Sequence, residues 1–311
     1  MSTASPFTRK PPAAPTVAQL IRFGAREFDA AGLAYGHGTS DARDDAAALA
    51  FHALGLDHAD AAAAYALKPD QAQVAKVLAL FGARVLRRTP AAYLMGRMWF
   101  AGLEFEVDPR VIVPRSPFAE LIAAGFEPWL DPGRVQRIVD LGTGSGCIAI
   151  ACAVRFPEAR VDAVDLSPDA LSVAARNVER HAVGERLQLH RGDMFEPLGD
   201  SVYDLIVSNP PYVSDAEMEA LPQEYLHEPD MALRAGSDGL DIVRRILRDA
   251  DAHLAPGGVL IVEVGDSDDR LQQAYPGVPF LWLEFAHGGG GVFLLTKDDL
   301  HRHRRELSGT S

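Results

Sequence analysis

The chain has 311 residues, 48% of them hydrophobic, and a formal net charge of −13 at pH 7. This length allows one large domain with a buried core and a smaller second domain, and the composition is that of a soluble globular protein. No stretch reaches the roughly 18 apolar residues of a membrane span, and the N-terminus lacks the apolar run of a signal peptide, so we expect a cytoplasmic protein without a membrane partner.

The charge is unevenly distributed along the chain. Residues 1–90 hold 10 basic and 8 acidic side chains, whereas residues 200–284 hold 17 acidic and 5 basic ones, a net charge of −12. A field of this sign repels a phosphate backbone and attracts a basic protein. We therefore expect a basic protein partner and no direct nucleic-acid binding, while ordinary solubility is an alternative explanation for the total charge.

The two cysteines, Cys147 and Cys152, are five residues apart in one expected helix and point to different faces of it. This spacing indicates neither a disulfide nor a metal site. We therefore expect no bound metal.

The first segments of the chain read as a flexible tail over residues 1–15 and a small helical domain over residues 16–90. Thr16 is expected to cap an amphipathic first helix, Ser40 to open a second, and Pro69 to precede a third. Nothing in this domain has catalytic character, so we expect it to pack against or recognise a partner.

Residues 91–117 are expected to form a β-hairpin linker. The alternating run at 98–107 turns about Gly102 and predicts the hairpin, and the stiff loop at 113–117 precedes an expected helix over 118–126. This linker is interpreted either as a hinge and wall of an active site or as a plain interdomain connection.

Residues 118–300 alternate strand-like and helical segments, which implies a parallel sheet with helices on both faces. The loop at 286–291 is too short for a parallel crossover, so the last strand is expected to be antiparallel. Residues 301–311 read as a second tail. The expected strands are 135–140, 160–165, 187–191, 203–208, 259–264, 280–285 and 292–296.

The sequence Ser208-Asn-Pro-Pro-Tyr212 follows one of these strands directly. Two successive prolines cannot continue a strand ladder or open a helix freely, so the strand ends here and the backbone turns out of the sheet. Asn209 is thereby placed at the carboxyl end of a strand, where open α/β sheets bind their ligands.

This stretch offers two hydrogen-bond acceptors, the side-chain oxygen of Asn209 and the backbone carbonyl of Pro210. Two convergent acceptors fit a group with two N–H donors, and Tyr212 adds a flat face for a planar system. The expected guest is an adenine or guanine amine or a glutamine side-chain amide. A strand-ending Pro-Pro loop with a surface tyrosine is the alternative interpretation.

A glycine-rich turn, Asp140-Leu-Gly-Thr-Gly-Ser-Gly146, follows the first strand of the large domain and opens a helix. Glycines let the backbone approach a ligand closely, and a helix start presents unpaired N–H groups. The spacing G-x-G-x-G differs from the dinucleotide-binding G-x-G-x-x-G, so the turn alone indicates only a nucleotide-like ligand.

Two further acidic residues follow the next strands. Asp165 ends the second strand over the same crevice, where a carboxylate can accept both hydroxyls of an adenosine ribose. Asp193, after the third strand, falls where a side chain could contact an adenine; the alternative is an aspartate that caps a turn.

Together these residues resemble class I S-adenosylmethionine-dependent methyltransferases of the HemK-type protein glutamine methyltransferase family. The resemblance runs from about Thr16 to Leu300 and includes the segments 227–233 (HEPDMAL), 236–240 (GSDGL) and 256–265 (PGGVLIVEVG). Asn-Pro-Pro-Tyr alone is shared with enzymes that methylate amino groups of DNA and RNA. Its combination with the segment 227–233 and the helical domain is much more specific.

The resemblance implies a Rossmann-like α/β fold with a seven-stranded, mostly parallel sheet whose last strand is antiparallel. It implies S-adenosylmethionine as cofactor, with S-adenosylhomocysteine as product. The implied catalytic residues are Asn209, Pro210 and Tyr212, and Pro211 joins them in substrate binding. The implied cofactor-binding residues are Asp140, Gly142, Thr143, Gly144, Ser145, Gly146, Asp165, Leu166, Asp193, Met194 and Asn209.

Release-factor methyltransferases of this family typically read Pro-Arg-Pro-Asp-Thr-Glu where this chain reads Pro114-Arg-Ser-Pro-Phe-Ala-Glu120. The departure is similar to the branch that modifies ribosomal protein L-three, in which Val-Pro-Arg-Ser-Pro and the endings 282–285 and 291–297 recur. Glu120 aligns with the family glutamate only after a one-residue shift, so it is placed outside the site. The role of Arg115 is left open.

The resemblance therefore implies methyl transfer to the side-chain amide nitrogen of a glutamine in the large-subunit ribosomal protein L-three. The alternatives are the glutamine of peptide chain release factors, an amino group of RNA or DNA, and a cofactor-binding module without catalysis. A nucleic-acid enzyme would require a basic face that the charge distribution does not offer.

Overall fold

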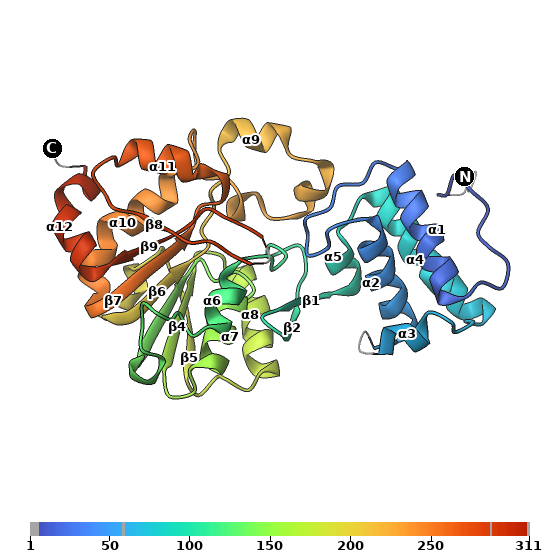
Figure 1. The fold of residues 1–311 in the computed structure, drawn as a ribbon, viewed down its shortest axis with the longest axis horizontal. Coiled ribbons are helices and arrows are strands. Elements are labelled where there is room, and N and C mark those ends of the chain that lie inside the picture. The colour runs from blue at the N-terminus through green and yellow to red at the C-terminus, as the bar shows by residue number, and fades with distance from the viewer. Residues whose placement is uncertain (1–5, 58–59, 287, 310–311) are drawn as a thin grey trace. The chain divides into compact units, whose positions relative to one another are not determined.

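The computed structural model describes residues 6–57, 60–286 and 288–309 (Figure 1). The chain separates into two compact units. The helical unit consists of the residues up to Met98 together with the later segment Pro222–His227. The sheet unit consists of Trp99–Leu221 and the residues from Glu228 onward. Among the described residues no helix is both long and apolar enough to cross a membrane.

The described residues of the helical unit that precede the hairpin form the helices α1 to α5. Their bounds are α1 Val17–Ala30, α2 Ala42–Leu54, α3 Ala61–Ala64, α4 Gln71–Arg87 and α5 Ala91–Met95. Thr16 caps α1 as predicted, with its hydroxyl and the side chain of Gln19 forming a reciprocal capping box. The predicted start of α2 at Ser40 is wrong by one position, because Asp41 accepts the free N–H groups of the first turn.

Buried charged side chains hold the segment Pro222–His227 in the helical unit. Arg84 is 1% exposed and donates to Asp45 Oδ2 at 2.7 Å and to the Ala34 carbonyl at 2.8 Å. Glu224, fully buried, accepts from the Ala34 N–H at 3.0 Å and pairs with Arg88 at 2.9 Å. Removing one partner of such a buried pair leaves an uncompensated charge, so the segment Pro222–His227 is firmly bound within this unit.

Part of the predicted N-terminal tail contacts the same unit. Residues 1–5 lie outside the described part of the chain, but the Thr8 N–H and hydroxyl donate to the buried carboxylate of Glu27 at 2.5 and 2.8 Å. The ring of Phe7 lies 5.1 Å from that of Phe23. Residues 7 and 8 are therefore held against α1.

The predicted hairpin is confirmed as β1 (Arg97–Phe100) and β2 (Leu103–Glu106), which form a two-stranded sheet. Its turn contains Gly102 at φ +78°. The helix expected over 118–126 is shorter, since α6 spans Phe118–Ala123. Gly125 adopts φ +66°, a left-handed conformation that cannot continue a right-handed helix.

The sheet unit contains a seven-stranded sheet in the order β5-β4-β3-β6-β7-β9-β8. Its strand β9 runs antiparallel to both neighbours, as predicted for the last strand, and the other pairs are parallel. The strands are β3 Arg137–Leu141, β4 Arg160–Asp165, β5 Leu187–Arg191, β6 Tyr203–Ser208, β7 Leu254–Glu263, β8 Leu281–Trp282 and β9 Val292–Thr296.

Helices cover both faces of this sheet (Figure 1). Besides α6, the sheet unit contains the helices α7 Cys147–Arg155, α8 Pro168–Arg180, α9 Asp215–Ala220, α10 Asp241–His253, α11 Asp268–Ala274 and α12 Lys297–Leu307. The residues 301–307, expected to belong to a C-terminal tail, complete α12 instead. Thr296 caps this helix, and Leu300 and Leu307 anchor it in the core. The loop before β9 was predicted to include His287, which lies outside the described residues.

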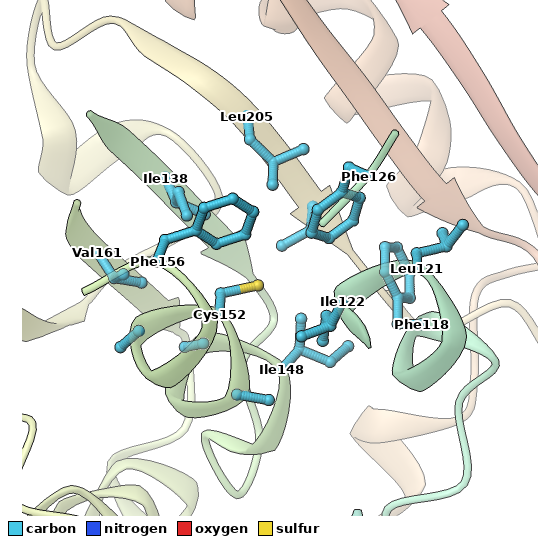
Figure 2. Close-up of a cluster of buried hydrophobic side chains, with 14 of the residues drawn as sticks. Phe118, Leu121, Ile122, Phe126, Ile138, Ile148, Cys152, Phe156, Val161 and Leu205 are labelled. Atoms are coloured by element: carbon cyan, nitrogen blue, oxygen red, sulfur yellow. The ribbon is translucent and has the colours of Figure 1, made fainter. Parts of the chain in front are cut away.

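Successive strand residues alternate between two cores, as the period of two requires. Ile138 and Leu205 face the side covered by α6 and α7, while Val139 and Ile206 face the side covered by α10 and α12. Figure 2 shows the first core, where the rings of Phe126 and Phe156 stack 6.1 Å apart and α7 inserts Cys152. Both cysteines are buried and free.

The strand order reverses between β3 and β6, because the chain fills one side of β3 with β4 and β5 before it crosses to the other. At such a switch point the loops beyond the carboxyl ends of neighbouring strands separate and leave a crevice. The residues that follow β3, β4 and β6 are therefore brought to one edge of the sheet.

Candidate functional site

A first cavity lies at this edge, in the sheet unit. The predicted cofactor-binding residues that line it are Gly142, Gly144, Asp165, Leu166, Asp193, Met194 and Asn209. The remaining predicted ones, Asp140, Thr143, Ser145 and Gly146, do not line it, because they are buried beneath the glycine turn or at the start of α7.

The glycine turn crosses the end of β4. The N–H groups of Gly142 and Thr143 both donate to the Val164 carbonyl at 2.9 Å. Gly142 and Gly144 have φ values of +73° and +56°, a region that strains residues with a Cβ. The backbone of the turn is therefore exposed to the cavity without side chains in between.

Asp165 is held rigidly at the cavity wall. Its Oδ2 accepts from the Gly144 N–H and its Oδ1 from the Ser167 N–H, each at 2.8 Å. Burial raises the pKa of this carboxyl, and the backbone N–H groups of Ser167, Gly144 and Leu166 oppose the rise. Because each carboxylate oxygen carries a further lone pair, Asp165 retains two acceptor positions for a ligand.

Asp140 supports the turn from beneath. Its Oδ2 accepts from the Thr143 hydroxyl at 2.6 Å and the Ala149 N–H at 3.2 Å. Its Oδ1 is buried and has no hydrogen-bond partner among the residues that the structure describes. Burial raises the pKa of this carboxyl to about 7, and the hydrogen bonds from Thr143 and Ala149 lower it.

Asp193 pairs with an arginine that sequence reasoning missed. Its Oδ2 lies 2.5 Å from an Nη of Arg245 on α10, and both residues line the first cavity. Met194 beside it has φ +50° and also lines the cavity. An arginine on an amphipathic helix gives no signal in the sequence, because most such residues are merely solvated.

A second cavity adjoins the Asn-Pro-Pro-Tyr stretch. It is lined by Asn209, Pro210 and Tyr212, together with Ile112, Arg115 and residues 232–233. Asn209 lines both cavities, whereas Pro211, predicted to bind substrate, lines only the first.

The stretch itself is fixed from two sides. The buried hydroxyl of Ser208 donates to the Leu141 carbonyl at 2.7 Å and so joins the ends of β6 and β3. Val213 forms a parallel bridge to Arg234, with the Val213 N–H donating to the Leu233 carbonyl at 2.8 Å. Residues 227–233, called the His-Glu-Pro segment below, and Arg234 therefore hold the backbone that follows Tyr212.

Arg115, whose role the sequence left open, forms a bidentate pair. Its two Nη atoms lie 2.5 and 2.7 Å from the carboxylate oxygens of Glu228, and the Val113 N–H donates to the same carboxylate at 2.9 Å. The pair fastens the loop 113–117 to the His-Glu-Pro segment at the second cavity. Glu120 lines neither cavity, and its carboxylate accepts from the Ala286 N–H at 2.9 Å.

Glu263, the last residue of β7, is the acidic residue that sequence reasoning did not place in the site. It is 6% exposed and accepts from the Ser116 hydroxyl at 2.6 Å and the Tyr212 hydroxyl at 3.4 Å. Burial raises the pKa of the Glu263 carboxyl to about 7. The hydrogen bond from Ser116, the positive charge of Arg115 and the hydrogen bond from Tyr212 offset part of this rise. The sequence signal that could have identified Glu263 is an acidic residue at the end of an apolar strand, which is also the signal that identified Asp165.

A known protein family and solved structures resemble this chain. Residues 126–239 match the family model described as "Methyltransferase small domain". A crystal structure titled "hMettl16 catalytic domain in complex with MAT2A 3'UTR hairpin 1" has a TM-score of 0.51 at 17% identity, covering 73% of this chain and 81% of that one. At this identity the similarity concerns the fold alone.

Curated relatives match nearly the whole chain, and three of them carry the name "Ribosomal protein uL3 glutamine methyltransferase". The protein of Xanthomonas campestris is 50% identical over 94% of this chain and 95% of its own. That of Neisseria meningitidis serogroup B is 48% identical over 92% and 94%. That of Bordetella pertussis is 47% identical over 92% and 96%.

Proposed function

This chain belongs to the family of ribosomal protein uL3 glutamine methyltransferases, and from this membership we propose that it methylates the side-chain amide nitrogen of one glutamine in ribosomal protein uL3. One observation of the site carries the proposal. Asn209 lines both cavities, so a cofactor in the first and an acceptor amide in the second would share this side chain.

The residues of the first cavity fit S-adenosylmethionine, which when bound supplies an electrophilic methyl group on a sulfonium. Asp165 keeps two acceptor positions, which suit the two hydroxyls of a ribose. The glycine turn admits a close backbone approach of such a ligand. Asp193 and Met194 would flank the adenine.

The residues of the second cavity suit an amide. A glutamine amide nitrogen is a poor nucleophile, because its lone pair is delocalised into the carbonyl. If Asn209 Oδ1 and the Pro210 carbonyl accept its two N–H groups, they orient the lone pair and favour the positive charge that develops on nitrogen. Tyr212 would stack on the amide plane, and the nitrogen proton can leave late to water or to an accepting carbonyl.

The charge distribution supports a protein substrate over a nucleic acid. The residues 200–284, which include the Asn-Pro-Pro-Tyr stretch, have a net charge of −12, and ribosomal proteins are basic as a class. The alternative of a release-factor glutamine has no support from the relatives compared, all of which are named for uL3.

The experiment is methyl transfer from tritiated S-adenosylmethionine to purified uL3, to purified release factors and to protein-free ribosomal RNA. We expect label in uL3 alone, in an amount of one methyl group per chain. Label in release factors with none in uL3 would overturn the substrate assignment, and label in RNA would overturn the acceptor chemistry.

A further inference from the structure

Four of the segments that line the first cavity follow neighbouring strands, so they have a fixed order along the sheet edge. The strand order β5-β4-β3-β6 places Asp193 at one end, followed by Asp165 and the glycine turn, with Asn209 at the other end. The ends of β5 and β4 are joined directly, because the Gly192 N–H donates to the Asp165 carbonyl at 3.1 Å. A ligand whose ribose binds Asp165 and whose reactive end lies at Asn209 therefore has its base at Asp193.

The backbone of Asp193 closes its own turn, while its side chain is engaged by another element. The Glu196 N–H donates to the backbone carbonyl of Asp193 at 3.0 Å. The Asp193 carboxylate forms an ion pair with Arg245, in which Oδ2 lies 2.5 Å from an Nη atom. This pair engages one carboxylate oxygen and leaves Oδ1 as an acceptor for a ligand.

The two partners of this ion pair are attached to the fold differently from each other. Arg245 lies on α10, which is anchored by the buried residues Val243, Ile246 and Leu247. Asp193 lies in the loop that follows β5. A side chain on a rigid helix can therefore fix the orientation of a side chain on a loop.

Both members of the pair line the first cavity, which is not true of its other arginine. Arg110 also lines this cavity, but its partner Asp108 does not. The pair of Asp193 with Arg245 therefore has a position from which it can act on a bound ligand.

An unrestrained aspartate carboxylate rotates freely, because its last torsion has no narrow minimum. Only some of its orientations then present an oxygen to a donor on the ligand. The exocyclic amino group of adenine is such a donor. We propose that Arg245 is a positioning residue, which holds Oδ2 of Asp193 so that Oδ1 accepts this amino group. The inference rests on the proposed function, since it takes S-adenosylmethionine as the ligand of the first cavity.

The exposure of the pair separates this role from a structural one. The side chains of Arg245 and Asp193 are 37% and 34% exposed, and ion pairs this open to solvent contribute little to the stability of a fold. We therefore expect Arg245→Met to fold and to unfold within about 2 °C of the wild-type melting temperature. A change in ligand recognition by this variant then reports on the cavity.

The test compares the calorimetric affinities of S-adenosylhomocysteine and of an analogue whose base is purine, with hydrogen in place of the amino group. The wild type should prefer the adenine compound about tenfold, which is the effect of one hydrogen bond to a partly solvated carboxylate. In Arg245→Met the preference should fall to about threefold or less, whereas Arg245→Lys keeps the charge and should retain most of it. Turnover on uL3 at saturating cofactor should stay within about twofold, because the base is remote from the transferred methyl group.

The matched control is Arg248→Met. Arg248 lies on the same helix and pairs with Asp249 at 2.7 Å, but it does not line the first cavity, so this variant should keep the wild-type preference. A double-mutant cycle then shows whether Arg245 acts through its partner. In an Asp193→Ala background, removal of Arg245 should no longer change the preference, whereas an arginine that contacts the base itself would still change it.

The outcomes separate this inference from the proposed function. No binding of S-adenosylhomocysteine by the wild type would overturn the proposed cofactor and this inference with it. An undiminished preference in Arg245→Met, or a further change when Arg245 is removed from Asp193→Ala, would overturn the role of Arg245 and leave the proposed function standing. If Arg245→Met does not fold, Arg245→Gln takes its place with the same expected loss of preference.

Discussion

Replacement of Asp165 by alanine tests the cofactor side of the account most simply. The Asp165 carboxylate keeps one free lone pair on each oxygen after it has accepted the N–H groups of Gly144 and Ser167. Hydrogen bonds to a charged acceptor contribute about 1.5 kcal/mol or more each, but water replaces part of this in a cavity open to solvent. A net loss of about 2 kcal/mol or more corresponds to at least about thirtyfold weaker binding of S-adenosylmethionine.

Isothermal titration calorimetry measures this loss directly, with Asp169→Asn as the matched control. Asp169 is an exposed carboxylate four residues further along, and it does not line the first cavity. Thermal unfolding of each variant without cofactor shows whether the glycine turn has survived. If folded Asp165→Ala binds S-adenosylmethionine as tightly as the wild type, Asp165 does not hold the ribose and the reasoning about the first cavity is wrong.

Three further predictions concern the acceptor, the pH dependence and the partner. Asn209→Ala should reduce turnover about a hundredfold or more while a calorimetric titration still finds cofactor bound; turnover near the wild-type rate would refute the acceptor model. Burial raises the folded-state pKa of Glu263 from 4.5, and of Asp140 from 3.8, to about 7, so the folded state binds more protons than the unfolded state between these values. The free energy of unfolding, from urea titrations without cofactor, should therefore fall as the pH rises toward 7, and less steeply in Glu263→Gln; equal slopes would contradict this. The transfer rate to uL3 should fall about tenfold between about 50 and 300 mM salt, and a salt-independent rate would argue against electrostatic steering.

The sequence predicted the strand bounds correctly where an apolar run is followed directly by a residue that ends a strand. Strands β4, β5, β6 and β9 have the predicted bounds, because apolar runs end in glycine, proline or a polar residue. It failed where tertiary contacts decide. Nothing local shows that residues 301–307 continue a helix, which depends on Leu307 being buried, or that Pro222–His227 binds in the helical unit through Glu224.

The sequence predicted those site residues that are polar and directly follow or end an apolar strand. Asp165 and Asn209 interrupt apolar runs at the edge where ligands bind, and both line the first cavity. Glu263 gave the same signal, but its contact with Ser116 joins β7 to a loop 147 residues away in sequence, which no local pattern shows. The pairing of Arg115 with Glu228 likewise joins distant segments that no local pattern connects.

The central claim is that this protein methylates a glutamine of uL3, and mass spectrometry of uL3 from cells that lack the protein tests it most directly. The account predicts that one glutamine-containing peptide of uL3 loses a single methyl group, that the wild-type gene restores it, and that the Asn209→Ala gene does not. A uL3 that keeps its methyl group in the deletion strain, with a release-factor glutamine unmethylated instead, would contradict the claim.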